Sequence, residues 1–258
     1  MATPKVLILR SAGINCDGET GYAFQLAGAQ VESIHINRLL ESPQQLQEFQ
    51  ILTFPGGFCY GDDIAAGRIL ANQIVHHLLD EVRAFVAADK LVLGICNGFQ
   101  ALVKTGLLPG GEDSTPGRQQ ATITFNDSAK FEDRWVYLEP ATDKCVFLDR
   151  GRRIAAPVAH GEGKLCFADT TVLQSLADNG QVALRYVDAE GKSDDYPVNP
   201  NASEDHVAGL CDSTGRIFGL MPHPERFIQT TQHPRWTRQE ITDPDGLTIF
   251  RNAVAYFN

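Results

Sequence analysis

The stretch of sequence that decides the fold is Lys90-Leu91-Val92-Leu93-Gly94-Ile95-Cys96-Asn97-Gly98-Phe99-Gln100. A short apolar run, typical of a buried strand, ends at a cysteine that stands between two glycines, and a helical pattern follows at once. Small residues at these two offsets let a strand and a helix crowd together around a nucleophile on a sharp turn. We therefore expect Cys96 to lie in a strained strand-to-helix turn, with Gly94 and Gly98 leaving room for it.

Cys96 at such a turn is a candidate nucleophile. The free N–H groups and the dipole of a helix N-terminus favour the thiolate, which is the reactive form of cysteine. The alternative is a buried cysteine that serves only as a small apolar side chain. A cysteine alone would fit that alternative, whereas the flanking glycines favour the nucleophile.

A histidine and a carboxylate follow a second apolar run, at residues 217–221. His223 could take the thiol proton, and Glu225 could hold and polarise its imidazole, which would complete a catalytic triad. Pro222 and Pro224 limit the backbone freedom on both sides of the histidine. The alternative is a polar turn that ends a strand, with Pro224 in the first turn of a helix.

A pair of glycines, Gly56 and Gly57, follows a third apolar run at residues 51–54. Glycines let backbone N–H groups approach a ligand closely, and acyl transfer needs such donors for the oxyanion of its tetrahedral intermediate. We expect the N–H group of Asn97 to be one donor and the Gly57 region to supply the other. An ordinary turn after a strand is the simpler interpretation of the glycine pair taken alone.

The order of the apolar patterns predicts an α/β fold with an open, mostly parallel sheet flanked by helices. Ligand sites in such sheets lie at the C-terminal ends of the strands, and the glycine pair, the cysteine and the histidine all fall there. The early strands are expected at 6–9, 31–36, 51–54 and 91–95, with helices at 17–27, capped by Asp17, and at 69–87. The later strands are expected at 120–125, 135–138, 154–158, 182–187, 207–211 and 216–220, with a last helix at 246–257.

Length and composition are those of an enzyme of ordinary size, and we expect one domain over residues 1–258. The net charge of −10 argues against nucleic acid or an anionic membrane as a partner. No apolar stretch approaches membrane-spanning length, and no signal-peptide pattern precedes the first strand. The six cysteines are scattered without a C-x-x-C pair, which favours a reducing compartment, the cytoplasm.

No metal site or cofactor is expected on this chain. The adjacent His76 and His77 have no partner four residues on, and Asp62 and Asp63 fit a loop or an interface better than a metal site. A G-x-x-x-x-G-K-[ST] phosphate loop is absent from the sequence, so we do not expect ATP to bind here.

These residues resemble a known family, the class I, triad-type glutamine amidotransferases, which share the cysteine turn and the His-Pro-Glu segment 223–225. Four further segments resemble, within this family, the glutaminase subunits of phosphoribosylformylglycinamidine synthase, an enzyme of purine biosynthesis. The segments are 54–63, 126–136, 159–164 and 196–203. The chain departs from the pattern at Cys59, where serine is usual, and at Ala202, where glycine is usual.

The resemblance implies that Cys96, His223 and Glu225 hydrolyse glutamine. It also implies a synthetase partner, which would use the ammonia to convert formylglycinamide ribonucleotide to formylglycinamidine ribonucleotide. ATP and Mg²⁺ would bind to that partner, and a small third subunit could join the complex.

The resemblance also suggests secondary residues of the site. Gln100 is expected to help bind glutamine, and His160 and Glu162 to line the pocket or face the synthetase. His160 is a rival base, because Glu162 stands two residues after it as Glu225 does after His223. We favour a pocket or interface role for His160.

Three other functions are consistent with parts of the pattern. A glutaminase subunit of another amidotransferase would share the triad but not the segments 130–135 and 159–164. A cysteine hydrolase or chaperone of the DJ-1 type would share the cysteine turn but not the His-Pro-Glu segment. A non-catalytic module on the same fold would have lost a member of the triad, and this sequence has all three.

Overall fold

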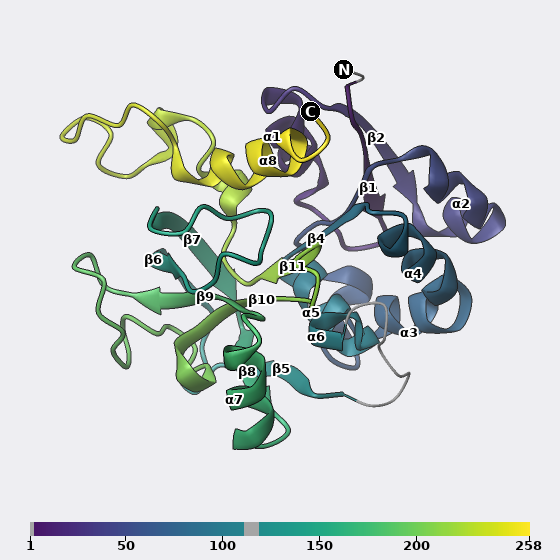
Figure 1. The fold of residues 1–258 in the computed structure, drawn as a ribbon. Coiled ribbons are helices and arrows are strands. Elements are labelled where there is room, and N and C mark those ends of the chain that lie inside the picture. The colour runs from purple at the N-terminus through teal and green to yellow at the C-terminus, as the bar shows by residue number, and fades with distance from the viewer. Residues whose placement is uncertain (1–2, 111–118) are drawn as a thin grey trace.

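The computed structural model describes residues 3–110 and 119–258, and a nine-stranded sheet runs through its centre (Figure 1). One half of the sheet consists of parallel strands in the order β2 (Gln30–His35), β1 (Lys5–Arg10), β3 (Ile51–Phe54), β4 (Leu91–Ile95) and β11 (Ile217–Leu220). The other half continues from β11 with antiparallel strands in the order β10 (Val207–Cys211), β9 (Val182–Val187), β6 (Glu132–Pro140) and β7 (Ile154–His160).

The predicted α/β fold class is therefore confirmed, with a mixed sheet flanked by helices. Strands β3, β4 and β11 are buried along their whole length, as expected for central parallel strands with helices on both faces. Their continuous apolar runs made them predictable. The antiparallel half of the sheet was not predicted as such, because the strand patterns carry no signal of direction.

A separate two-stranded antiparallel sheet pairs β5 (Ala121–Phe125) with β8 (Glu162–Phe167). Strand β8 was not predicted, and neither was helix α7 (Thr170–Asp178), which follows it. The side chains of β8 alternate between half-buried and buried positions. Because β8 is short and contains polar residues, its sequence lacks the apolar run from which the other strands were predicted.

Helices lie on both faces of the parallel half of the large sheet (Figure 1). On one side α1 (Asp17–Leu26) packs against α8 (Asp245–Ala255), with Phe24 and Phe250 in edge-to-face contact at 4.9 Å. On the other side lie α3 (Arg68–His77), α4 (Leu79–Ala87), α5 (Asn97–Thr105) and α6 (Leu107–Gly110). A short helix, α2 (Ile36–Glu41), follows β2, and 3₁₀ turns are found at 43–48, 59–62, 204–206, 224–226 and 230–232.

Several predicted boundaries differ in detail, and three of the differences change the start of a helix or divide it. The long helix expected at 69–87 is two helices, because the backbone of Leu78 leaves the helical region at φ −136°. Asp17 does not cap α1 but lies in its first turn, and Cys16 is the capping residue. Ile36 begins helix α2 rather than ending the strand before it. None of these differences moves a residue of the predicted site.

Among the residues that the structure describes, no helix is long and apolar enough to cross a membrane.

Candidate active site

Cys96 lies in a sharp turn between β4 and α5, as the sequence predicts. Its backbone has φ 51° and ψ −108°, a strained conformation for a residue with a side chain. The packing explains both neighbouring glycines. A β-carbon on Gly94 would come within 2.6 Å of the Leu102 side chain, and one on Gly98 would overlap the carbonyl oxygen of Phe54. The close approach of the strand and the helix thus requires glycine at 98 and leaves little room for a side chain at 94.

His223 and Glu225 form a closely bonded pair directly after β11. Nδ1 of the imidazole lies 2.6 Å from Oε1 of the carboxylate, and both side chains are almost completely buried. The backbone N–H of His223 donates to the carbonyl of Pro157, which fixes the turn. Burial alone would lower the pKa of His223. The negative charge of Glu225 and the nearby Cys96 thiol outweigh that effect and hold the pKa well above its usual value.

The sheet brings the cysteine and the histidine together. Strands β4 and β11 are parallel neighbours with Ile95 opposite Leu220, and the N–H of Cys96 donates to the carbonyl of Leu220 at 2.8 Å. Both side chains therefore leave the same edge of the sheet. Nε2 of His223 has no hydrogen-bond partner among the described residues, so this atom is available to exchange a proton.

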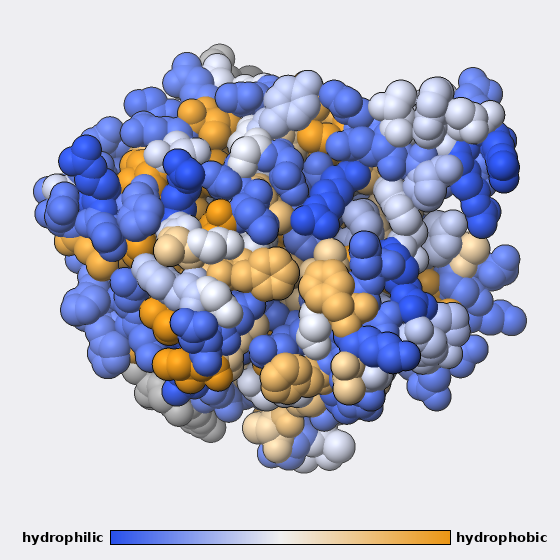
Figure 2. All heavy atoms as spheres, turned by 180° about the vertical axis from the view of Figure 1, so that it is seen from behind, coloured by the Kyte–Doolittle hydropathy of each residue, from blue (hydrophilic) through white to orange (hydrophobic). Residues whose placement is uncertain are grey.

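Cys96 opens into a small cavity of about 180 Å³. Other residues that the sequence singles out line the same cavity, among them Gly57, Gln100, His160, Gly161 and Glu162. The exposed rings of Phe58, Phe125 and Phe131 also line it. Figure 2 shows apolar side chains gathered at the surface on the face turned away from the viewer in Figure 1. The cavity thus combines a nucleophile, polar groups and an apolar mouth.

The two expected oxyanion donors are placed differently in the fold. The N–H group of Asn97 belongs to the first turn of α5, directly after the nucleophile. Gly57 has φ 147° and forms an isolated bridge with Ile14, and a β-carbon at Gly57 would come within 2.8 Å of the Gly13 carbonyl. Glycine is therefore required there by its conformation and by its neighbours. Gly57 and Cys96 line the same cavity, which keeps both predicted donors near the sulfur.

The Gln100 side chain is already engaged within the protein. Its Oε1 accepts from the amide of Asn97 at 2.9 Å, and its Nε2 donates to the backbone carbonyl of Glu162. The Asn97 amide also donates to Asp62 at 3.0 Å, and burial raises the pKa of that carboxyl group. Asp62, which the sequence suggested as a loop or interface residue, lines the cavity. Gln100 and Asp62 thus belong to one network in the cavity wall.

His160 lacks the carboxylate partner that the rival assignment needs. Its Nδ1 faces the amide oxygen of Asn126 at 3.1 Å, and Glu162 instead accepts from the backbone N–H of Ala66. Burial, together with the charge of His223, lowers the pKa of His160 to about 4. A neutral histidine without a carboxylate is a weak general base, so the geometry favours His223.

Cys16 is a neighbour of the His223–Glu225 pair that the sequence did not suggest. Its sulfur, a ring nitrogen of His223 and a carboxylate oxygen of Glu225 all lie within 4.8 Å of one another. Thiolate, imidazole and carboxylate can together bind zinc. The 2.6 Å contact between His223 and Glu225, however, is a hydrogen bond of the kind found in acid–base pairs.

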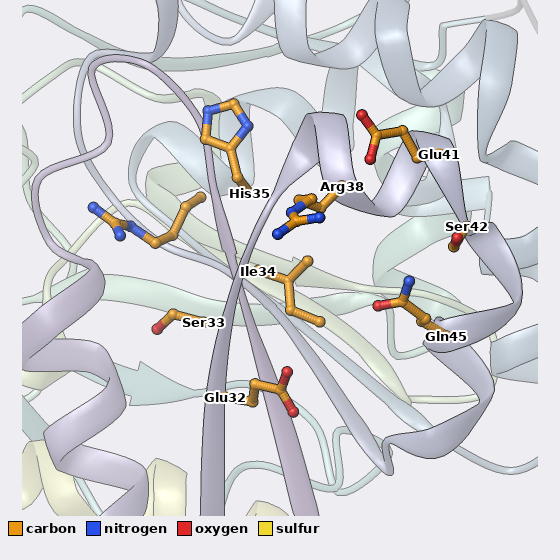
Figure 3. Close-up of a pocket in the computed structure, with 9 residues that line it drawn as sticks. Glu32, Ser33, Ile34, His35, Arg38, Glu41, Ser42 and Gln45 are labelled. Carbon is orange, nitrogen blue, oxygen red and sulfur yellow. The ribbon is translucent and has the colours of Figure 1, made fainter.

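A larger cavity lies elsewhere, beside the edge strand β2. Its volume is about 440 Å³, and Figure 3 shows the side chains that surround it, among them Glu32, His35, Arg38 and Glu41. Arg10, which also lines it, is paired with Asp17 at 2.7 Å. The lining contains no cysteine and shares no residue with the cavity at Cys96. Cavity size therefore does not identify the site, and the side chains that line the smaller cavity do.

Comparisons with known proteins show what the whole chain is similar to. The sequence profile of the CobB/CobQ-like glutamine amidotransferase domain matches residues 3–257. The chain is 49% identical to phosphoribosylformylglycinamidine synthase subunit PurQ of Dehalococcoides mccartyi, over 99% of this chain and 98% of the relative. It is 40% identical to the subunit of the same name from Methanococcus maripaludis, over 99% and 98%. Among solved structures, the structure of PurLQS from Thermotoga maritima contains a chain with a TM-score of 0.75 and 27% identity, with both chains fully covered.

Proposed function

Since the chain belongs to the CobB/CobQ-like glutamine amidotransferases, and among them to the glutaminase subunits of phosphoribosylformylglycinamidine synthase, we propose that Cys96, His223 and Glu225 carry out its glutamine hydrolysis. The strongest support is the 2.6 Å hydrogen bond between the side chains of His223 and Glu225. These residues follow β11, which pairs with β4, the strand that ends just before Cys96. Buried carboxylate, imidazole and thiol then stand in the order that nucleophilic catalysis requires.

The first half of the reaction forms a thioester. The Cys96 thiolate attacks the side-chain amide carbon of glutamine, and the carbonyl oxygen becomes an oxyanion. The N–H groups of Gly57 and Asn97 stabilise this oxyanion by hydrogen bonds. The protonated imidazole of His223 then gives its proton to the departing nitrogen, so the C–N bond breaks and ammonia leaves. Glu225 holds the ring in place and stabilises its positive charge before that transfer.

The second half returns the enzyme to its starting state. The neutral imidazole of His223 takes a proton from a water molecule, and the resulting hydroxide attacks the thioester carbon. The C–S bond breaks, glutamate leaves, and the Cys96 thiolate is regenerated beside the protonated His223. Overall, one glutamine and one water give one glutamate, one ammonia and the proton that the new carboxyl group releases.

The cavity residues bind and orient the substrate in this proposal. Gln100, Glu162 and His160 line the space next to the Cys96 sulfur. The network from Asn97 to the Glu162 carbonyl fixes Gln100 at the start of α5 and keeps the wall of the cavity rigid. Such a fixed wall holds the reacting amide at a constant distance from the sulfur, which is where much of an enzyme's rate advantage arises.

The partner of this chain is a synthetase subunit that consumes the ammonia. The similar solved structure is entitled PurLQS, and the similar chains are named as subunits of the synthase. The synthetase converts formylglycinamide ribonucleotide to formylglycinamidine ribonucleotide. ATP and Mg²⁺ belong to the synthetase in this proposal, and a small third subunit completes the complex. The location that fits this role is the cytoplasm, where purine synthesis would supply the substrates.

The variant Cys96→Ala tests the assignment in the assembled complex. We expect glutamine-dependent synthesis and glutamate release to fall to background, while synthesis from added ammonium salt stays at the wild-type rate. Cys211→Ala is the matched control, because it removes another fully buried thiol, on β10, away from the cavity. Glutamate release at the wild-type rate by Cys96→Ala would contradict the proposal.

A further inference from the structure

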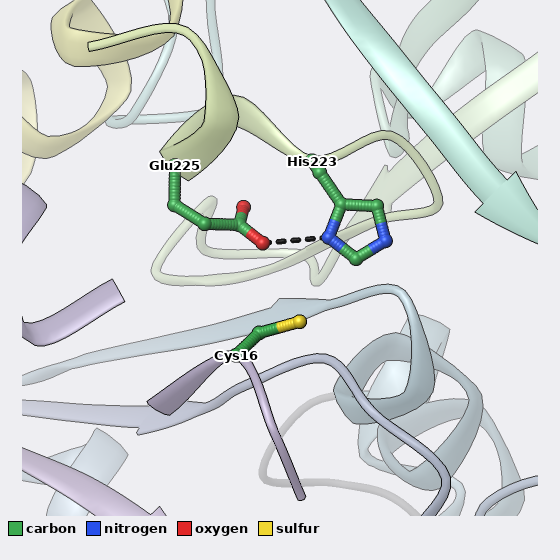
Figure 4. Close-up of side chains that lie close together, drawn as sticks. All are labelled: Cys16, His223 and Glu225. Atoms are coloured by element: carbon green, nitrogen blue, oxygen red, sulfur yellow. Dashed lines mark hydrogen bonds and ion pairs between the residues drawn. The ribbon is translucent and has the colours of Figure 1, made fainter. Parts of the chain in front are cut away.

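Cys16 lies in the loop between β1 and α1, where it is the capping residue of that helix, and its side chain is only 1% exposed. The reaction described above makes no use of it. Figure 4 shows its thiol directed toward the imidazole of His223, on the side where Glu225 is also bound. This position, against the acid–base pair rather than in the substrate cavity, calls for a separate explanation.

The thiol of Cys16 is neutral and held in place. Burial raises the pKa of Cys16 above its usual value, so the sulfur keeps its proton at neutral pH. That S–H group donates to the side-chain oxygen of Asn15 at 3.3 Å, and the sulfur accepts from Nη2 of Arg226 at 3.3 Å. Arg226 is in turn paired with Glu19 at 3.3 Å. A protonated, hydrogen-bonded thiol is not a second nucleophile.

The backbone of Cys16 is bonded to the other half of the site. Its N–H group donates to the carbonyl of Gly56 at 3.2 Å, and its carbonyl accepts from both the N–H and the hydroxyl of Thr20. Gly56 directly precedes Gly57, the predicted oxyanion donor. The start of helix α1 is thereby tied to the glycine turn.

Gly56, His223 and Cys16 are also packed against one another. A β-carbon on Gly56 would lie 2.8 Å from Cε1 of His223 and 3.3 Å from the Cys16 sulfur. The imidazole and the sulfur therefore both lie close to the α-carbon of this glycine and leave no room for a side chain there. A shift of any one of these three residues would move the other two.

We propose that Cys16 is a positioning residue that keeps the His223 imidazole and the Gly56–Gly57 turn at a fixed distance from each other. Its side chain supports the edge of the ring, and its backbone holds the turn. The proton donor to ammonia and the donor to the oxyanion are thereby set at a fixed separation. This inference rests on the proposed triad, because it explains how the histidine of that triad is oriented.

Two variants of the complex test this role through kcat and KM for glutamine. Cys16→Ala leaves the ring unsupported, and we expect kcat to fall about ten-fold or more while KM changes less than about two-fold, because misaligned reacting groups slow the chemistry. Cys16→Ser keeps a donor and an acceptor for Asn15 and Arg226, and we expect it to recover part of the lost kcat. Synthesis from added ammonium salt, measured alongside, shows that each variant has assembled with its partner.

Cys211→Ala is again the matched control, since it removes a buried thiol of β10 and should lower stability without lowering kcat. A kcat within two-fold of the wild-type value in Cys16→Ala would overturn the inference. So would a loss confined to KM, or a fall in kcat no greater than that of Cys211→Ala. If Cys96→Ala abolishes hydrolysis but the Cys16 variants keep their kcat, the triad stands and only the role of Cys16 fails.

Discussion

Nδ1 of His160 lies 3.1 Å from the side-chain oxygen of Asn126, and this contact fixes which nitrogen of the imidazole carries the proton. The amide nitrogen of Asn126 donates to the carbonyls of Lys130 and His160, so its oxygen is the acceptor, and that oxygen also accepts the N–H of Gly163. His160 must therefore donate from Nδ1, which leaves Nε2 as a lone-pair acceptor. Nε2 is buried and has no partner among the described residues.

The two histidines should differ sharply when each is replaced by alanine. His223→Ala removes the proposed triad base, and we expect the glutaminase rate of the complex to fall on the order of ten-thousand-fold or more. His160→Ala removes a cavity wall and should cost far less. The glutaminase rates of both variants, each in the assembled complex, decide between them. Equal losses, or a larger loss in His160→Ala, would identify His160 as the base.

His160 should also make the stability of the protein depend on pH. Its pKa is about 4 in the folded protein against 6.5 in the unfolded chain, so the unfolded state binds more protons between these values. The contribution of this residue to the free energy of unfolding is therefore fully present above pH 6.5. It decreases as the pH falls toward 4, by roughly 1.4 kcal/mol per pH unit. Between pH 7 and pH 5 this amounts to about 2 kcal/mol.

Urea unfolding of the wild-type protein and of His160→Gln at pH 7 and pH 5 measures this contribution. The wild-type protein should lose about 2 kcal/mol more than the variant over this interval, because the glutamine side chain does not titrate. The carboxylates and other histidines contribute to both proteins and cancel in the comparison. Identical losses in the two proteins would show that His160 titrates normally in the fold.

Gly98 should not tolerate even a methyl group. A β-carbon there would lie 1.9 Å from the carbonyl oxygen of Phe54, which belongs to the neighbouring strand and cannot rotate away. We expect Gly98→Ala to destabilise the protein by at least about 3 kcal/mol. Gly18→Ala is the matched control in helix α1, where nothing lies within 4 Å of the new carbon. Thermal unfolding of the two variants gives the comparison, and similar midpoints would disprove the predicted clash.

The isolated chain should be a poor glutaminase that its synthetase partner activates. Ammonia released without an acceptor is wasted, and Gly57 can reorient its peptide more easily than other residues could, while the bond from Cys16 to Gly56 holds the start of the turn. If the partner sets this turn, it adds one oxyanion donor, which is worth about a hundred-fold or more in rate. Glutamate release by the purified chain, with and without the synthetase and its ligands, measures the effect. Full turnover by the chain alone, unchanged by the partner, would exclude this mode of control.

The sequence was sufficient where structure depends on local spacing. The turn at Cys96 and the His-Pro-Glu segment are short patterns whose geometry the chain itself dictates, and the continuous apolar runs identify the central strands. The resemblance to the family also anticipated a glycine at position 202, and Ala202 indeed has φ 61°, in the left-handed region. Alanine is strained in this backbone conformation, whereas glycine would adopt it without strain.

What the sequence could not show depends on contacts between distant segments. Cys16 and His223 are neighbours only because the end of β1 and the end of β11 reach the same edge of the sheet. Asn126 meets His160 through the pairing of β5 with β8, and β8 itself was missed. The break at Leu78 is likewise invisible, because apolar residues keep their helical spacing on both sides of it.

The position of β11 has a consequence for the newly synthesised protein. This strand is the last of the sheet to leave the ribosome, yet it lies in the middle, between β4 and β10. Until it inserts, β4 and β10 have no strand between them with which to pair, and His223 is not yet beside the Cys96 thiol. A nascent chain, or one that ends before residue 223, therefore carries the proposed nucleophile without the proposed base, and we expect it not to hydrolyse glutamine.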